Sequence, residues 1–554
     1  MAVDNAYIAE SFSLLAKLMD IHGENSFKTK SYAVAAFNID KLTEDLTLVP
    51  HEKIISIKGI GSSIGKQIVE IVETGGLGQL REIIQKTPPG VIEMLKIKGL
   101  GPKKISTVWK EMEIESIGEL MYACNENRLL LYKGFGEKTQ NNIRDTISFY
   151  LKNQGSFLFA EVEGYVHLVN KNLRESFPQH LIAITGLFRR QLEIVDQPEW
   201  VCSIPQADLS SYLSTLELSV TQSANEILTV SGGEHISLKF HCVPSETFYS
   251  RLFETSASEA FLDAWKKRFP QVANPTSEES IFHEAGISFI PSALREDPSI
   301  LDKSLNLLPL IQTSDIKGII HSHSNWSDGS QTIEQMAKAC IEQGFEYLVI
   351  SDHSKSAFYA NGLSEERLRE QHHYIDELNL QFAPFHIFKS IESDILNDGN
   401  LDYSDQILKT FDLVIASVHS NLKMTEEKAM NRLLRAIENP HTRILGHPTG
   451  RLLLSRPGYP VDHQRLIEAC AEHKVVIELN AHPRRLDLEW RWIDYALQKN
   501  VLISIDPDAH SVTGYHDIHY GVLAAQKGGL RAEQNLSSFS LEQMKKFVAK
   551  KVDG

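Results

Sequence analysis

The sequence predicts a multidomain protein with an α-helical N-terminal region, an α+β middle region and a C-terminal (β/α)7 barrel. The chain of 554 residues, 42% of them hydrophobic, is long enough to bury several separate cores. A short Lys-Gly-x-Gly unit occurs three times in the first 150 residues, whereas 15 of the 22 histidines lie between His321 and His519. These uneven distributions indicate that the N-terminal and C-terminal regions have different functions.

Composition excludes several classes of protein. The formal net charge of −16 argues against a protein that coats nucleic acid through an excess of Lys and Arg. The sequence has no run of about 18 apolar residues that would suggest a membrane span, and its first residues do not resemble a secretory leader. The five cysteines are odd in number and far apart, which fits a reducing compartment. We therefore expect a monomeric cytoplasmic protein without membrane contact.

Each N-terminal repeat places one apolar residue between two glycines and continues into a helical pattern. The three copies span Ile57–Ile68, Ile97–Ile105 and Tyr132–Thr139. Glycines permit positive φ and close backbone approach, and the free N–H groups of the following helix form an anion site that needs little net charge. This pattern resembles the helix-hairpin-helix motif of non-sequence-specific DNA binding, although each unit could instead only turn the chain between packed helices. The residues expected to contact the DNA backbone are Gly59, Gly61, Gly99, Gly101, Lys103, Gly134, Gly136 and Lys138.

The N-terminal region also resembles the small DNA-binding domain of family X DNA polymerases. The resemblance rests on Asn25–Ala36, which precedes the first hairpin. It implies a DNA-binding domain at 1–85, followed by a fingers-like domain with the second and third hairpins at 86–152. In some members a lysine of the first hairpin's helix removes a 5′-deoxyribose phosphate, but Gln67 stands at the matching position. We therefore do not expect lyase activity.

Residues 153–300 resemble the palm and thumb of the same family without its catalytic carboxylates. The segment Ile184–Glu199 matches the part of the palm where family members carry an Asp-x-Asp pair, and a third Asp follows on a neighbouring strand. Gln197, Glu199 and Ser237 occupy these positions here. Nucleotidyl transfer requires hard carboxylate oxygens around two Mg²⁺ ions, and an amide and a hydroxyl cannot replace them. We therefore expect that polymerase activity has been lost.

Seven apolar, β-branched runs follow a linker at 301–315 and define a C-terminal domain at 316–554. The runs are Lys317–Ile320, Tyr347–Ile350, His386–Phe388, Leu413–Ala416, Arg443–Leu445, Val475–Asn480 and Val501–Ile505. Helical patterns lie between them, so we expect parallel strands in a barrel whose chemistry lies at the strand carboxyl ends. Six of the seven runs carry a candidate metal ligand. Pairs such as His321 and His323 are expected to project to one side of extended backbone.

The order of these candidate ligands is very similar to that of the PHP (polymerase and histidinol phosphatase) domain, which many bacterial family X polymerases carry. The matching motifs are His-x-His, Ser327-Asp328-Gly329, Ser351-Asp352-His353, Ile391-Glu392-Ser393-Asp394, Val418-His419-Ser420, Gly446-His447-Pro448 and Asp508-Ala509-His510. The resemblance implies nine metal ligands, which are His321, His323, Asp328, His353, Glu392, His419, His447, Asp508 and His510. Family members use them to hold two to three divalent ions. The mixed imidazole and carboxylate donors suit Mn²⁺, Zn²⁺ or Fe²⁺.

Four residues are assigned to catalysis. Glu392 is expected to bridge metal ions, and Asp508 is expected to complete the cluster that activates a water molecule and clamps a phosphate. Arg451 and Arg485 are expected to hold that phosphate by forked hydrogen bonds. The alternative for both arginines is a structural ion pair.

The sequence therefore predicts a metal-dependent phosphodiesterase that degrades DNA in the 3′-5′ direction. We expect it to bind the DNA backbone at gaps or 3′ ends and to trim 3′ ends during DNA repair. One alternative is a small-molecule phosphatase of the histidinol-phosphate type, which the same ligands would serve. Another is a non-catalytic DNA-binding scaffold, against which the nine ligand-type residues argue.

Overall fold

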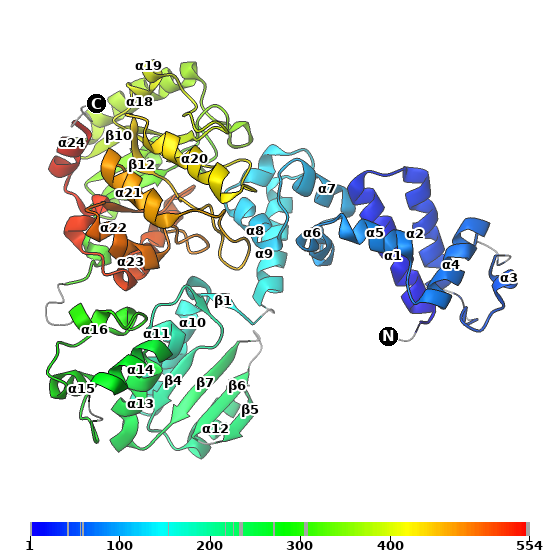
Figure 1. The fold of residues 1–554 in the computed structure, drawn as a ribbon, viewed down its shortest axis with the longest axis horizontal. Helices are drawn as coiled ribbons and strands as arrows, with labels where there is room; N and C mark the ends of the chain where they lie inside the picture. Colours follow the sequence, from blue (N-terminus) through cyan, green and yellow to red (C-terminus); the bar gives the residue numbers. More distant parts are fainter. Residues whose placement is uncertain are drawn as a thin grey trace. The chain divides into compact units, whose positions relative to one another are not determined.

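The structure, a computed structural model, describes the chain except residues 1–2, 41, 43, 56, 58–59, 153–154, 217, 225, 232–235, 270–271, 304–308 and 550–554. The chain forms two compact units (Figure 1). One unit contains residues 1–125 and 129–150, and the other contains residues 126–128 and 151–554. Among the described residues, no helix has both the length and the apolar composition that a membrane crossing requires.

The first unit is helical in all of its regular elements that the structure describes. Its helices are α1 (Asn5–His22), α2 (Ser26–Asp40), α3 (His51–Ile54), α4 (Ser62–Thr74), α5 (Gly78–Gln85), α6 (Pro89–Glu93), α7 (Pro102–Lys110), α8 (Ile117–Asn125) and α9 (Glu137–Lys152). Local signals set the ends of α1, because the Asp4 side chain accepts from the Tyr7 N–H and Gly23 ends the helix at φ 75°. The helical architecture predicted for this region is confirmed.

The second unit begins with an α+β part, residues 155–303, which we call the palm region. Its mixed five-stranded sheet has the order β2-β4-β7-β6-β5. The strands are β2 (Ile182–Thr185), β4 (Glu199–Cys202), β5 (Ser219–Ala224), β6 (Ile227–Ser231) and β7 (Ser237–Cys242). Trp200 of β4 and Phe240 of β7 stack in its core with ring centroids 5.2 Å apart. The accompanying elements are β1 (Phe157–Leu158), α10 (Phe159–Ser176), α11 (Gly186–Arg189), β3 (Ile194–Val195), α12 (Gln206–Thr215), α13 (Phe248–Thr255), α14 (Glu259–Arg268), α15 (Glu278–Glu284) and α16 (Ile300–Lys303).

Residues 309–549 form the barrel, whose seven parallel strands follow one another in sequence order. The strands are β8 (Gly318–Ser322), β9 (Tyr347–Ile350), β10 (His386–Asp394), β11 (Leu413–Ser417), β12 (Thr442–Leu445), β13 (Val476–Asn480) and β14 (Ile503–Asp506). A parallel bridge between Ser322 and Ala509 brings the last strand to the first and nearly closes the barrel. The predicted (β/α)7 architecture is confirmed, because the strands are parallel and helices connect them.

Helices cover the outside of the barrel (Figure 1). They are α17 (Ile333–Glu342), α18 (Glu365–Phe382), α19 (Asp405–Leu408), α20 (Glu426–Ile437), α21 (His463–His473), α22 (Ile493–Gln498), α23 (Ile518–Lys527) and α24 (Leu541–Ala549). Buried aliphatic side chains such as Ile350, Ile391 and Leu445 fill the layer between strands and helices. This packing fixes the strand ends, on which the candidate ligands lie.

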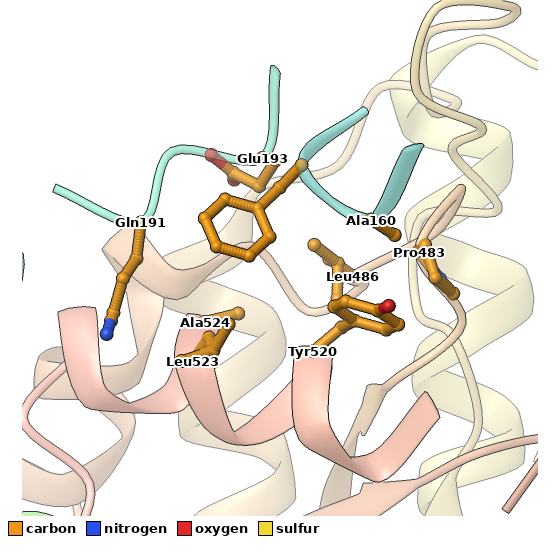
Figure 2. Close-up of a pocket in the computed structure, with 9 residues that line it drawn as sticks. Ala160, Gln191, Glu193, Pro483, Leu486, Tyr520, Leu523 and Ala524 are labelled. Carbon is orange, nitrogen blue, oxygen red and sulfur yellow. The ribbon is translucent and has the colours of Figure 1, made fainter. Parts of the chain in front are cut away.

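The palm region packs against the barrel along a seam of apolar contacts and ion pairs. Figure 2 shows a small, mostly apolar cavity at this seam, lined by Phe159, Ala160, Gln191, Glu193, Pro483, Leu486, Tyr520, Leu523 and Ala524. Arg484 of the barrel lies 2.9 Å from Glu161, and His519 lies 2.8 Å from Glu163. The ammonium group of Lys527 donates to the Arg190 carbonyl oxygen at 2.8 Å. The palm region is therefore built into the same unit as the barrel.

Candidate metal centre

All nine predicted ligand residues meet at the carboxyl ends of the barrel strands. His321 lies within β8 and Glu392 within β10, whereas the other seven follow strand ends. Together they form four overlapping groups, and within each group the donor atoms lie within 4.8 Å of one another. The groups are His323, Asp328, His353 and His510; His321, His323 and Asp508; His321, Glu392 and His447; and His353, Glu392 and His419.

Glu392 lies at the centre of the cluster and is buried. Its Oε1 lies 3.0 Å from Nε2 of both His419 and His447. Its Oε2 lies 2.9 Å from Nδ1 of His353. Both oxygens thus face ring nitrogens of different groups, and the expected bridging of metal ions by Glu392 stays a prediction.

Three of the nine residues have left-handed backbone conformations. The φ angles are 56° at His321, 21° at His447 and 51° at Asp508. The register between β8 and β9 also shifts between Ile319 and Ser322, a stretch that contains His321. The prediction that pairs such as His321 and His323 project from extended backbone is therefore wrong at His321, although the two residues do converge.

Asp352 organises the loop that carries Asp328. Its carboxylate accepts from the Ser324 N–H at 2.7 Å and from the hydroxyls of Ser324 and Ser327 at 2.6 and 2.5 Å. The Gln371 amide donates to it at 2.6 Å. The sequence placed this residue in a motif without assigning it a role. Its four donors show that it holds the loop rather than facing the cluster.

Two further carboxylates orient ligand histidines, and the sequence assigned neither of them. Asp394 lies 2.5 Å from Nδ1 of His419, and Glu478 lies 2.5 Å from Nδ1 of His321. A carboxylate on one ring nitrogen directs the other nitrogen toward the metal position. The available signal was weak: Asp394 follows Glu392 by two residues, and Glu478 interrupts an apolar run.

Carboxylates raise the pKa of some rings of the cluster, whereas burial and neighbouring rings lower the pKa of His323 to about 3. Burial alone would lower the pKa of His419, but the Glu392 and Asp394 carboxylates outweigh burial and raise that pKa to about 9. Burial likewise opposes protonation of His510, yet Asp328 raises its pKa to about 9. The carboxylates thus stabilise the protonated, positively charged form of these two rings. A cation bound among the donors would compensate the same negative charge in place of these protons.

Several buried ring nitrogens of the cluster make no hydrogen bond in the described part of the protein. Among the described residues, Nε2 of His321, Nδ1 of His323 and Nε2 of His510 are buried and make no hydrogen bond of acceptable geometry. Such groups are costly to bury without a partner. The mixed set of imidazoles and carboxylates therefore fits divalent cations such as Mn²⁺, Zn²⁺ and Fe²⁺.

The structure separates the two predicted phosphate-binding arginines. Nε of Arg485 lies 3.9 Å from Asp508 Oδ2, so Arg485 reaches the cluster. Arg451 instead lies 3.6 Å from Glu193 and 3.6 Å from Glu489. This geometry favours the ion-pair alternative for Arg451, and the proposed phosphate contact now rests on Arg485.

The two glycines of a hairpin have different backbone conformations. Gly99 and Gly134, the first glycines of the second and third hairpins, have φ angles of 89° and 97°. The second glycines do not need positive φ, since Gly61 and Gly101 cap their helices at −71° and −79°. Gly59 lies outside the described residues. Only the first position of the described hairpins therefore requires glycine for its backbone angle.

The second glycines border open space. A Cβ atom at Gly101 or Gly136 would meet no heavy atom within 4 Å. Lys103 and Lys138, which lie in the first turns of the following helices, are exposed. The fold itself therefore does not demand glycine at these two positions, whereas close approach of an external phosphate would.

Gln67 of the first hairpin has neutral partners. Its amide donates to the Tyr32 hydroxyl at 3.0 Å and to Gln79 Oε1 at 3.3 Å. A lysine nucleophile would have to replace this network, and the neighbouring Lys66 is exposed instead.

The palm region brings together the residues at the polymerase carboxylate positions, but protein groups satisfy them. Gln197 donates to the Ser237 hydroxyl at 2.6 Å. Glu199 lies 3.0 Å from the Lys239 ammonium and 2.9 Å from the His241 ring. Burial would raise the pKa of Glu199, but His241 and Lys239 outweigh burial and lower it. The single remaining carboxylate is therefore neutralised from within.

The arginines of the palm motif are also engaged. Arg189 lies 2.6 Å from Glu278, which also pairs with the buried Arg295 at 2.5 Å. Arg190 lies 3.4 Å from Glu296. These pairs join the sheet to the helices that follow it, so the charges hold the palm region together.

Family models match both ends of the chain. Residues 3–77 match a helix-hairpin-helix domain, and residues 91–147 match a SAM-like helix-hairpin-helix tandem. Residues 320–482 match the PHP domain. Seven of the nine candidate ligands lie inside that match, whereas Asp508 and His510 lie beyond it and join the cluster in the structure.

One curated relative is similar over nearly the whole chain. The Bacillus subtilis protein named DNA polymerase/3′-5′ exonuclease PolX is 32% identical over 96% of this chain and 97% of its own length. A probable phosphatase from Caldanaerobacter subterraneus is 31% identical over 29% of this chain and 60% of its own length. The probable phosphatase YcdX of Escherichia coli is 25% identical over 29% of this chain and 62% of its own length. The two phosphatases are thus similar to only part of the chain.

Proposed function

This chain belongs to the family X DNA polymerases that carry a C-terminal PHP domain, and from that premise we propose that it is a metal-dependent 3′-5′ exonuclease that has lost polymerase activity. Its role would be to trim 3′ ends during DNA repair. The observation that carries the proposal is the convergence of nine ligand-type residues, with buried ring nitrogens that lack hydrogen bonds. The three hairpins on the same chain make DNA the favoured substrate over a small phosphoester.

The residues of the cluster have distinct roles in this proposal. Divalent ions held by the nine residues would lower the pKa of a bound water and neutralise the phosphate in an in-line displacement. Glu392 would hold the centre of the cluster, since both of its oxygens face ring nitrogens. Arg485, near Asp508, would orient the scissile phosphate through its guanidinium group. The hairpins would hold the DNA backbone and keep the 3′ end at the barrel.

Loss of polymerase activity is supported by the contacts of Glu199. Its carboxylate is paired with Lys239 and His241, so a Mg²⁺ ion would have to displace a fixed ammonium group. Gln197 and Ser237 supply no charge to attract a second ion. The palm region would then serve as a scaffold rather than as a catalytic domain.

Direction of degradation can be tested with protected DNA ends. Full-length protein loaded with Mn²⁺ is incubated with single-stranded and gapped DNA that carries phosphorothioate linkages at the 3′ end, at the 5′ end or at neither. We expect degradation to stop only when the 3′ end is protected. Degradation blocked by 5′ protection, or hydrolysis of histidinol phosphate without any cleavage of DNA, would overturn the exonuclease proposal.

Polymerase loss can be tested by primer extension with Mg²⁺ and with Mn²⁺. Extension should stay at background in protein free of contaminating polymerase. Template-dependent extension that disappears in Glu199→Ala would show that the palm region is still catalytic.

A further inference from the structure

β13 is the barrel strand without a predicted metal ligand, yet it contributes two buried polar side chains, Glu478 and Asn480. One oxygen of Glu478 lies 2.5 Å from Nδ1 of His321, and the other accepts from the His447 N–H at 3.1 Å. The Asn480 amide donates to Glu478 at 3.0 Å and to Asp508 at 3.0 Å. This pair therefore contacts three ligand residues that follow or lie in three other strands.

The three ligand residues held by this pair are those with left-handed backbone. Among the nine, only His321, His447 and Asp508 have positive φ. Residues other than glycine adopt this region rarely, and they persist there only when surrounding contacts fix them. The hydrogen bonds of Glu478 and Asn480 are such contacts, because one of them acts directly on the backbone of His447.

Glu478 also fixes which nitrogen of His321 faces the cluster. With Nδ1 donating to the carboxylate, Nε2 is left to point at Glu392 Oε1, 3.2 Å away, and at Asp508 Oδ1, 3.4 Å away. Partners of this kind set the orientation and basicity of a metal-binding histidine. Asp394 likewise accepts a hydrogen bond from Nδ1 of His419.

We propose that Glu478 is a positioning residue that, together with Asn480, presets His321, His447 and Asp508 for metal binding. The inference rests on the proposed function only in taking the cluster as a metal centre. It divides the centre into two parts. The groups His321–His323–Asp508 and His321–Glu392–His447 depend on Glu478, whereas the group around His419 depends on Asp394.

Metal occupancy of the full-length protein tests this division. Wild type, Glu478→Gln and Asp394→Asn are dialysed against buffered free Mn²⁺, and bound Mn²⁺ per chain is measured by mass spectrometry. We expect Glu478→Gln to weaken binding by about 10- to 100-fold at part of the centre, as loss of an outer-shell partner commonly does. Glu370→Gln, an exposed change on α18, is the matched control and should bind like wild type.

The readouts separate positioning from general folding. A positioning role predicts that high Mn²⁺ restores hydrolysis of a nitrophenyl phosphoester in Glu478→Gln, whereas Glu478→Ala remains weaker. If Glu478→Gln does not fold, Asn480→Ser removes the contact to Asp508 and should show the same partial loss of Mn²⁺. Mn²⁺ binding within twofold of wild type in a folded variant would overturn the inference. Normal Mn²⁺ binding by wild type without DNA degradation would instead overturn only the exonuclease proposal.

Discussion

The palm region and the barrel both gather polar side chains at the ends of their strands, but these side chains have different partners. In the palm region Gln197 donates to Ser237, and Glu199 pairs with Lys239 and His241. In the barrel three carboxylates and six histidines converge, and several buried ring nitrogens make no hydrogen bond among the described residues. Each palm group is thus satisfied by the protein, whereas the barrel groups are satisfied only in part.

This difference indicates what distinguishes a site that can bind a cation from a site that has lost this ability. Lys239 is a fixed internal cation, so the palm region has little uncompensated negative charge to offer a metal. In the barrel the carboxylates raise the pKa of His419 and His510 to about 9, which marks a demand for positive charge. Both places carry polar side chains at strand ends. Their internal partners distinguish the two.

The largest expected effect tests the barrel side of the comparison. Glu392→Ala should lower kcat for both DNA and a nitrophenyl phosphoester by about 10²–10³-fold or more, because losing one interaction that stabilises the transition state commonly costs that much. Glu392 contacts rings of several groups, so its loss should affect all of them. Activity is measured with saturating Mn²⁺ and with chelator, and Glu370→Ala on α18 serves as the control. A fall smaller than tenfold would place the chemistry elsewhere.

Metal removal should make the stability of the barrel depend on pH in the range between about 6.5 and 9. In the metal-free protein the pKa of His419 and His510 is about 9, above the usual value near 6.5. Their stabilising contribution is therefore complete below about pH 6.5 and is lost as the pH rises through about 9. The thermal midpoint of the metal-free protein should fall by ~5 °C or more between pH 6.5 and 9.5.

Thermal scans in chelator and in Mn²⁺ check this dependence. Mn²⁺ should flatten it, because ligand histidines bind metal as neutral rings. Replacing both histidines by Gln should flatten the metal-free curve as well. A midpoint that is constant or rises with pH in chelator would contradict the account.

The palm side of the comparison predicts a structural rather than a catalytic effect. Glu199→Gln should lower the free energy of unfolding by about 2 kcal/mol at neutral pH, the usual scale for a hydrogen bond to a charged group. The pKa of Glu199 is lowered, so its contribution is present above about pH 4.5 and is lost as the pH falls through the folded value. Exonuclease kcat should stay within twofold of wild type. Denaturant unfolding at pH 7 and pH 4 measures the effect, and a loss of DNA hydrolysis would show that the palm region takes part in catalysis.

The candidate ligands could be predicted because each follows a short apolar run and a recognisable motif. The rule that chemistry lies at strand carboxyl ends is enough to predict His447 and His419. They follow the apolar runs Arg443–Leu445 and Leu413–Ala416. The backbone at His321 could not be predicted in this way. Its left-handed angle occurs where the register with β9 shifts and beside the bridge from Ser322 to Ala509, which forms only when the barrel closes.

Contacts between residues far apart in sequence also escaped prediction. Glu478 reaches His321 across the barrel, and Arg451 turns toward Glu193 because the palm region packs beside it. Neither contact has a local sequence pattern. Local signals therefore identified the residues that could bind metal, whereas the partners that orient them required the three-dimensional arrangement of the strands.

The smallest expected effect concerns DNA affinity. If ion pairs within the palm region already occupy its arginines, the hairpins should provide most of the contacts to DNA. Gly101→Val and Gly136→Val place a side chain where an external phosphate would approach, and neither position has positive φ or a neighbour within 4 Å. The fold should therefore tolerate both changes. Each should weaken binding of DNA of any sequence by about tenfold, or about 1.4 kcal/mol, and should reduce the salt dependence of binding.

Fluorescence anisotropy at several salt concentrations measures this affinity, and hydrolysis of a nitrophenyl phosphoester should stay unchanged because the barrel is intact. Gly164→Val is the matched control, since this exposed glycine on α10 also borders open space but lies outside the hairpins. If Gly101→Val or Gly136→Val folds and binds DNA like wild type, the glycines of that hairpin only turn the chain between helices. If both variants bind like wild type, DNA contact would have to come from the first hairpin or from the second unit, where ion pairs already engage the palm arginines.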